Sequence, residues 1–155
     1  MTQVVDTPEQ QAPKDLIGFL DFYLVRKAPF QIPDAGKEAL VKFGPWIAVI
    51  FLVLSLPVLL FALGVSAFVA PWLLGPRYAA GFGILTIGTF IYFGLLAAAL
   101  PGLFARKMSG WTLAFYGELV IIVSQLLSGN IFSALIGGLI GLYLLFQIRP
   151  LYRTH

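Results

Sequence analysis

The stretch from Trp111 to Ile148 decides the fold, and it reads WTLAFYGELVIIVSQLLSGNIFSALIGGLIGLYLLFQI. Two apolar arms, 111–127 and 131–148, flank a short SGN turn. An α-helix rises about 1.5 Å per residue, and a membrane-spanning helix needs about 17 to 25 apolar residues. Each arm is therefore just long enough to cross a bilayer, and the stretch predicts a transmembrane helical hairpin.

The composition of the whole chain agrees with this interpretation. Of its 155 residues, 59% are hydrophobic and 11% are charged, against about 25% charged in a typical soluble domain. A soluble domain of this size buries only about 60 to 70% of the surface that its unfolded chain exposes, so water would face too much apolar surface. We therefore predict an all-α integral membrane protein with four transmembrane helices, preceded by a short cytoplasmic amphipathic region of two helices.

The N-terminal part of the chain differs in character from the rest. Residues 1–13 are polar and contain proline, which is typical of a mobile tail. Residues 14–44 are expected to form two amphipathic interfacial helices, separated by the PFQIP break at 29–33, because proline removes a backbone donor and restricts the residue before it. The first helix, over 14–27, is expected either to lie in the headgroup layer or to dock on the helix bundle.

The second short helix is expected over residues 34–43. Asp34 can cap its N-terminus, and Glu38 and Lys42 have the spacing of an i,i+4 ion pair. The chain would then enter the bilayer at Gly44.

The transmembrane domain is predicted to cover residues 45–149, with a cytoplasmic tail at 150–155. Pro57 lies near the middle of the first span and predicts a kink that serves packing rather than a functional hinge. The segment 69–78 contains two prolines and a glycine and is expected to be an interfacial loop. Pro101 is expected to end or kink the second span. The four spans are placed at about 46–68, 79–100, 111–127 and 131–148.

Basic residues are distributed unevenly around these spans. Of the ten Lys and Arg residues, nine fall on one predicted side of the membrane and only Arg77 on the other. Cytoplasmic segments carry an excess of Lys and Arg, so both termini and the connector at 101–110 are expected in the cytoplasm. Hydropathy and the polar terminal segment suggest a bacterial inner membrane or an equivalent. Trp46 and Trp111 would then lie at the same interface. The bases that set this topology near the later spans are Arg106, Lys107, Arg149 and Arg153.

Glu118 lies about 10 Å into the third span by helical rise. An acid near the centre of a spanning helix costs about 2.5 to 3.5 kcal/mol on insertion scales. Gln125 follows on nearly the same face and Ser124 lies beside it, which makes an intramembrane polar stripe. One interpretation is a proton or cation site that faces a bundle interior or an oligomer axis. The other is interhelical hydrogen bonding, with Glu118 protonated or paired with Arg106 or Lys107.

Small residues at intervals of four mark two helices as packing surfaces. Such spacing lets helix backbones approach closely in a membrane. Packing within the bundle is one interpretation, and association with a second copy or another membrane protein is the other. The two sets are Gly94, Ala98 and Gly102 in the second span, and Ser133, Gly137 and Gly141 in the fourth.

The residues that catalysis needs are missing from the predicted spans. The lone histidine is His155 at the end of the chain, no aspartate follows Asp34, and cysteine is absent. A Ser/His pair, histidine or thiolate metal ligation, a two-aspartate protease and disulfides are therefore excluded from the spans. No phosphate-binding glycine motif is present. We expect no enzyme and no cofactor or metal site, although apolar grooves leave lipid, quinone or pigment contacts open.

Two functional hypotheses follow from these patterns. The first is a non-catalytic membrane subunit or assembly element, whose partners are the lipid bilayer and either other membrane protein subunits or a second copy of itself. The alternative is a small homo-oligomeric transporter or channel that uses Glu118 and Gln125 as its polar site. The charge of +3 is explained by topology, so no nucleic-acid partner is expected.

Overall fold

The computed structural model describes residues 15–153, and these residues form helices and no β-strand. The predicted tail at 1–13 lies outside the described residues. A π-helical turn, Phe22–Arg26, follows α1, and a second, Val65–Val69, follows α2. The helices are α1 (Leu16–Asp21), α2 (Asp34–Gly64), α3 (Ala70–Leu73), α4 (Gly75–Phe104), α5 (Met108–Leu127) and α6 (Ile131–Ile148).

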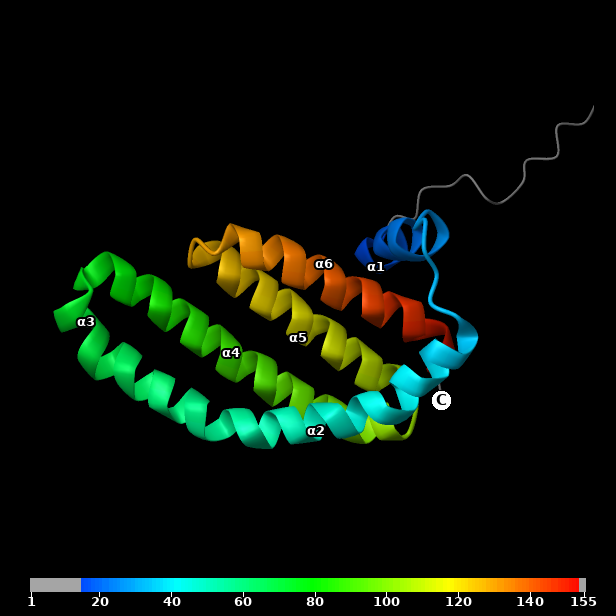
Figure 1. Ribbon diagram of the computed structural model, residues 1–155, viewed down its shortest axis with the longest axis horizontal. Coiled ribbons are helices and arrows are strands. Elements are labelled where there is room, and N and C mark those ends of the chain that lie inside the picture. The colour runs from blue at the N-terminus through cyan, green and yellow to red at the C-terminus, as the bar shows by residue number, and fades with distance from the viewer. Residues whose placement is uncertain (1–14, 154–155) are drawn as a thin grey trace, which may run out of the picture.

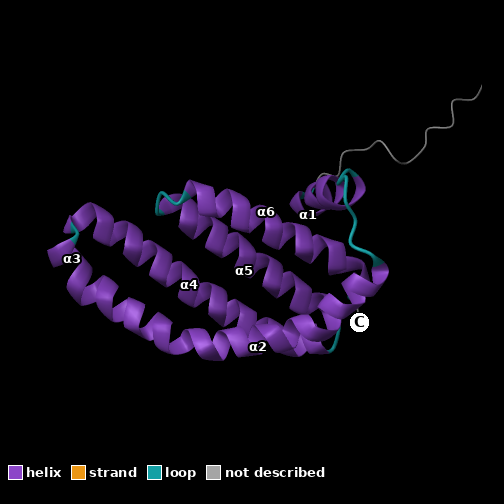
Figure 2. Ribbon diagram, in the orientation of Figure 1, coloured by secondary structure: helices purple, strands orange, loops and turns teal. Residues whose placement is uncertain are grey.

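Four helices of the described chain, α2, α4, α5 and α6, are long and apolar enough to cross a membrane, as predicted. α4 and α5 share the largest interface, α2 packs on α4, and α6 packs on α5 (Figure 1). Residues 15–30, which we call the α1 segment, and the end of α6 lie at one end of the bundle, which we call the terminal end (Figure 2). α3 and the turn between α5 and α6 lie toward the other end, which we call the open end.

The predicted hairpin turn is confirmed. α5 ends at Leu127 and α6 begins at Ile131, so the SGN segment forms the whole connection. Gly129 has a φ of 82°, a backbone conformation that glycine adopts without steric cost. The polar turn residues therefore mark both helix ends correctly.

The start of the first span differs from the prediction. α2 runs without interruption from Asp34 through Pro45 to Gly64, so residues 34–43 belong to the spanning helix and do not form a separate one. A proline inside a helix removes one hydrogen bond and bends the axis, but it does not have to end the helix when packing holds the flanking turns. Pro45 is buried against the bundle, and α2 curves along its length (Figure 1).

The segment 69–78, predicted as a loop, is largely helical. α3 occupies part of it, and α4 begins at Gly75, four residues before the predicted start. Gly75 has a φ of 77° and makes the turn, while Pro76 sits in the first turn of α4, where no backbone N–H is needed. Pro101 does not end α4, which continues to Phe104.

The N-terminal segment docks on α6, which is one of its two expected positions. The Arg149 guanidinium lies 3.2 Å from the Asp21 carboxylate, and the Gln147 amide donates to the Leu24 carbonyl at 3.2 Å. The Tyr143 hydroxyl donates to the Phe30 carbonyl at 2.6 Å. Polar groups of α6 therefore hold the α1 segment to the bundle.

An aromatic core closes the terminal end. Trp111 stacks on Phe115 with ring centroids 5.5 Å apart, and Phe146 meets both rings edge-on. The Trp111 indole donates to the Leu145 carbonyl at 2.7 Å, and the side chain is only 1% exposed. The ring and the N–H of Trp111 are thus both satisfied inside the protein, and its expected position at the membrane interface stays a prediction. Trp46, in contrast, is exposed.

Glycine and serine residues seven apart form the interface between α4 and α5. A Cβ added to Gly102 would lie 2.6 Å from the Gly110 Cα. One added to Gly117 would lie 3.6 Å from the Leu95 Cβ, and one added to Gly88 would overlap Ser124. We call these contacts the α4–α5 seam, and it brings the two backbones closer than larger side chains would allow.

We predict that Gly102→Ala lowers the free energy of unfolding by about 1 to 3 kcal/mol, because the new methyl group meets the backbone of Gly110. Gly94→Ala is the matched control, since nothing lies within 4 Å of a Cβ at that position. It should leave stability unchanged or raise it by up to about 1 kcal/mol through helix propensity. Unfolding in detergent micelles measures both; equal losses would contradict the seam.

Candidate functional site

A cavity of about 320 Å³ lies between the four long helices toward the terminal end, and Glu118 lines it. The other lining residues are mostly aliphatic, so the carboxyl group faces an apolar enclosure. They come from all four helices and the segment after α6, and include Leu40, Gly44 and Pro45 of α2, Tyr92, Leu96 and Leu103 of α4, Gly141 and Leu145 of α6, and Tyr152.

Gly141 makes room for the Glu118 side chain. A Cβ built on Gly141 would lie 2.6 Å from the carboxyl carbon of Glu118 and would overlap its nearer oxygen. The carboxyl group therefore occupies the space that a side chain on α6 would fill. One residue of the predicted small-residue set in α6 thus serves the predicted polar residue of α5, a relation that the sequence did not indicate.

Two phenol groups share the cavity with Glu118. Tyr92 packs on Gly117 of α5, where an added Cβ would lie 3.3 Å from its ring, and its hydroxyl is within electrostatic range of Glu118. Tyr152 is buried at the end nearer the termini. Burial raises the pKa of Tyr152, and the nearby Arg106 charge opposes this increase. The Tyr152 phenol is therefore protonated at neutral pH and can donate a hydrogen bond.

The expected pairing of Glu118 with Arg106 is not present. Arg106 instead forms a two-point contact with Glu38 at the start of α2, with one nitrogen 3.2 Å from its oxygen. This contact raises the pKa of Arg106. It also replaces the predicted i,i+4 pair between Glu38 and Lys42, since a planar guanidinium matches both oxygens of a carboxylate. Within residues 15–153, Glu118 belongs to none of the ion pairs.

The basic residues predicted to set topology also make structural contacts. The backbone of Arg153 pairs with the connector between α4 and α5: its N–H donates to Arg106 at 2.8 Å, and its carbonyl accepts from Met108 at 2.7 Å. The strand-like bridge between Lys107 and Arg153 follows from these two bonds. Arg149, besides binding Asp21, lies over the Trp111 ring at 5.3 Å.

The polar stripe predicted on α5 does not converge on one site. Gln125 does not line the Glu118 cavity, and its side-chain oxygen is buried without a hydrogen bond. Ser124 faces α4 at Gly88, and its hydroxyl donates to the Val120 carbonyl at 2.8 Å. The three residues therefore have different surroundings, because α5 is contacted by α4 and α6 on different faces.

The predicted small-residue sets are each divided between the interior and the surface. Gly102 and Gly141 face other helices of the chain. Ser133 and Gly137 of α6 are exposed, as are Gly94 and Ala98 of α4. Packing of α6 inside the chain instead uses Ala134, Gly138 and Leu142, which are all buried.

The chemistry that this cavity allows is narrow. The Glu118 carboxyl group can take up or release a proton, or, with the two phenol oxygens, hold a small cation whose remaining ligands are water. Among the described residues, no group of three or more His, Asp or Glu side chains could hold a metal ion. Sequence reasoning did not find Tyr92, Tyr152 or the α2 residues that line the cavity. They come from distant parts of the chain and form no motif.

No protein-family model, curated protein or solved structure matches the chain in the three comparisons made. The geometry of the site is therefore the basis for any statement about function.

We predict that Gly141→Ala destabilises the protein only while Glu118 is present, because the new methyl group occupies the position of the carboxyl group. In a Glu118→Ala background the same substitution should be close to neutral. A double-mutant cycle of unfolding free energies should therefore give a coupling of at least about 0.5 kcal/mol between the two positions. Simple additivity would show that the two residues do not share this space.

Proposed function

We propose that this chain is a non-catalytic integral membrane subunit, or assembly element, that packs through the outer face of α6 against a helix of another subunit or a second copy. The observation that carries the proposal is the outward position of Ser133 and Gly137. The inner face of α6 has its own small residues for packing within the chain, so the outer pair is not needed for the fold.

The surroundings of this pair support the proposal. A Cβ on Gly137 would meet nothing within 4 Å, and the nearby Ile136 and Ile140 side chains are exposed. In a membrane, lipid tails are as apolar as leucine, so helices associate mainly where small residues allow close backbone contact. A helix from outside could therefore approach α6 along Ser133 and Gly137.

We also propose a placement in a bacterial inner membrane, with both termini in the cytoplasm. The basis is the uneven distribution of Lys and Arg: of the nine basic residues in the described range 15–153, Arg77 alone lies toward the open end. The amphipathic α1 segment, held to α6, would then lie at the cytoplasmic interface.

Two adjacent glycines provide a test of the helix partner. Gly137→Leu should dissociate the native complex, or weaken it by about tenfold or more, and leave the unfolding temperature of the isolated chain unchanged. Gly138→Leu is the matched control, because a Cβ there would lie 2.7 Å from the Ile122 side chain and should destabilise the fold itself. Native mass measurement after gentle solubilisation separates the two effects.

An unchanged particle mass for Gly137→Leu would contradict the proposal. A complex that contains a foreign subunit would support the subunit version, and a symmetric homo-oligomer would support self-association.

A second candidate, a proton or cation path through Glu118, is favoured by the cavity around this residue. The cavity lies within one chain, so this candidate no longer needs the oligomer axis that the sequence suggested, and Gln125 has no part in it. An acid inside a spanning segment is often a transport residue, because its insertion cost needs a compensating role.

Glu118→Gln keeps the shape of the side chain and removes its charge. If Glu118 carries protons or cations, this variant should lower flux into dye-loaded liposomes by about tenfold or more, with particle mass and unfolding temperature unchanged. Glu118→Asp is the control that keeps the acid and should retain part of the flux. If the wild type shows no flux and Glu118→Gln lowers the unfolding temperature, Glu118 is a helix-packing residue.

A further inference from the structure

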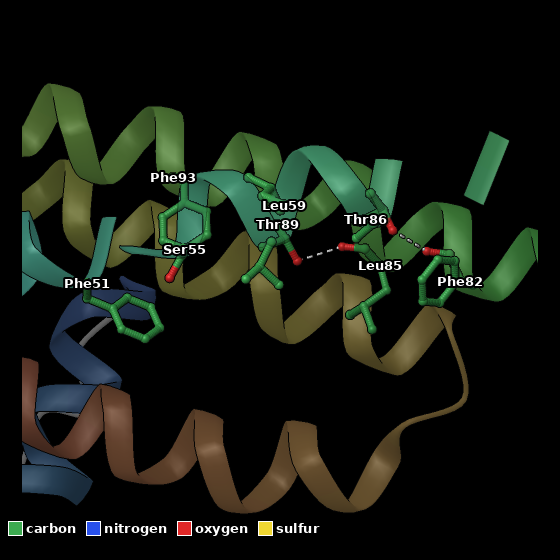
Figure 3. Close-up of a pocket in the computed structure, with 10 residues that line it drawn as sticks. Phe51, Ser55, Leu59, Phe82, Leu85, Thr86, Thr89 and Phe93 are labelled. Carbon is green, nitrogen blue, oxygen red and sulfur yellow. Dashed lines mark hydrogen bonds between the residues drawn. The ribbon is translucent and has the colours of Figure 1, made fainter. Parts of the chain in front are cut away.

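Two adjoining hollows line α4 toward the open end, away from Glu118. The inner one, of about 310 Å³, lies between α2 and α4 and is walled by Phe51, Val58, Leu59, Ala62, Leu85 and Phe93 (Figure 3). Two of its three hydroxyl groups are bonded within α4: Thr86 donates to the Phe82 carbonyl at 2.8 Å and Thr89 to the Leu85 carbonyl at 2.7 Å, and the third belongs to Ser55 of α2 (Figure 3). We call this hollow the α2–α4 groove, and it offers an occupant almost no polar partner.

The outer hollow, of about 580 Å³, lies beside this groove, between the start of α4 and the turn after α5, and we call it the mouth. Phe82 and Leu85 line both hollows, so they adjoin. The mouth is polar, with Arg77, Tyr78 and Asn130 on its wall. Ser128 also lines it, but its hydroxyl is already bonded to the Gly81 carbonyl at 2.8 Å. A polar mouth thus adjoins an apolar groove.

Arg77 gives the mouth a positive charge without a partner. No ion pair of residues 15–153 includes Arg77, and no acidic residue occurs between Glu38 and Glu118 in the sequence. The exposed Trp72 and Tyr78 flank it, and aromatic residues of this kind gather at the membrane interface. A guanidinium at this level is suited to a phosphate group, which it can bind through two parallel hydrogen bonds.

The length of the α2–α4 groove matches the hydrocarbon thickness of one lipid leaflet. Phe82 and Phe93 bound the groove and are eleven residues apart in α4, which is about 16 Å by helical rise. Half of the roughly 30 Å hydrocarbon core of a bilayer is about 15 Å. Arg77 lies five residues before Phe82, about 8 Å nearer the membrane edge. A phosphate at Arg77 would therefore place an acyl chain along the groove.

The shape of the groove favours an extended occupant. Its volume of about 310 Å³ is spread along about 16 Å of α4, so it is long and narrow. A single hydrocarbon chain is an extended occupant that the groove can take.

We propose that the α2–α4 groove and its mouth form a binding site for one anionic phospholipid, with its phosphate at Arg77 and one acyl chain between α2 and α4. This site uses the membrane placement proposed above, but it needs neither the helix partner at Gly137 nor a role for Glu118. Its occupant would fill the space that the curved α2 leaves beside α4.

The test uses the full-length protein in detergent, titrated with phosphatidylglycerol, with bound lipid counted by native mass spectrometry. Wild type should retain one phosphatidylglycerol per chain. Arg77→Gln should weaken binding about tenfold or more through loss of the phosphate contact, and Leu85→Trp should do the same by filling the groove. Arg77→Lys should keep part of the affinity. Lys42→Gln, which removes an exposed base at the terminal end, is the matched control and should bind like wild type.

Several outcomes would overturn the proposal. The wild type could retain no phosphatidylglycerol, or Arg77→Gln could bind it as well as the wild type does. Inorganic phosphate alone could also displace the lipid, which would show an anion site that holds no acyl chain. An effect of Arg77→Gln without one of Leu85→Trp would place the chain elsewhere. If Leu85→Trp changes the unfolding temperature, Leu85→Phe supplies a milder filling of the same groove.

Discussion

Close approach of the α4 and α5 backbones is the contact around which the other helices are arranged. In lipid, burying an apolar side chain against another helix gains little, so the area of close packing decides which helices pair. Gly102 meets Gly110, Leu95 meets Gly117, and Gly88 meets Ser124, at steps of seven residues. A repeat of seven keeps one face of each helix turned to its neighbour, which is the geometry of a coiled-coil contact. The outer helices α2 and α6 then attach to opposite sides of this central pair.

The two ends of the bundle differ in what the curved α2 encloses with the other helices. At the terminal end, α2 crosses toward α6, and the Glu38 contact with Arg106 ties its first turns to the connector between α4 and α5. The aromatic core around Trp111 lies there, and so does the Glu118 cavity. Toward the open end, the apolar groove lies between α2 and α4. Glu118 and Arg77 therefore line hollows toward opposite ends of the bundle.

Several polar side chains of the long helices donate hydrogen bonds to backbone carbonyls of the same chain. Thr86, Thr89 and Ser124 return their hydroxyl protons to carbonyls of their own helices, so they pack as small residues without an unsatisfied donor. Tyr143 and Gln147 reach the N-terminal segment and hold it against α6. Glu118 differs from these residues, because it faces a cavity rather than a carbonyl.

Sequence reasoning correctly located the four apolar helices, the hairpin turn at Gly129 and the unusual acid at Glu118, because length, hydropathy and turn chemistry act within a few neighbouring residues. It also found small residues at intervals of four, but it did not find the repeat of seven that joins α4 to α5, since either spacing is visible in a glycine-rich helix. The continuity of α2 through Pro45, the pairing of Arg106 with Glu38 and the place of Glu118 against Gly141 were decided by tertiary packing. Each joins residues far apart in the chain, and the free energy of such a contact exists only after both helices are in place.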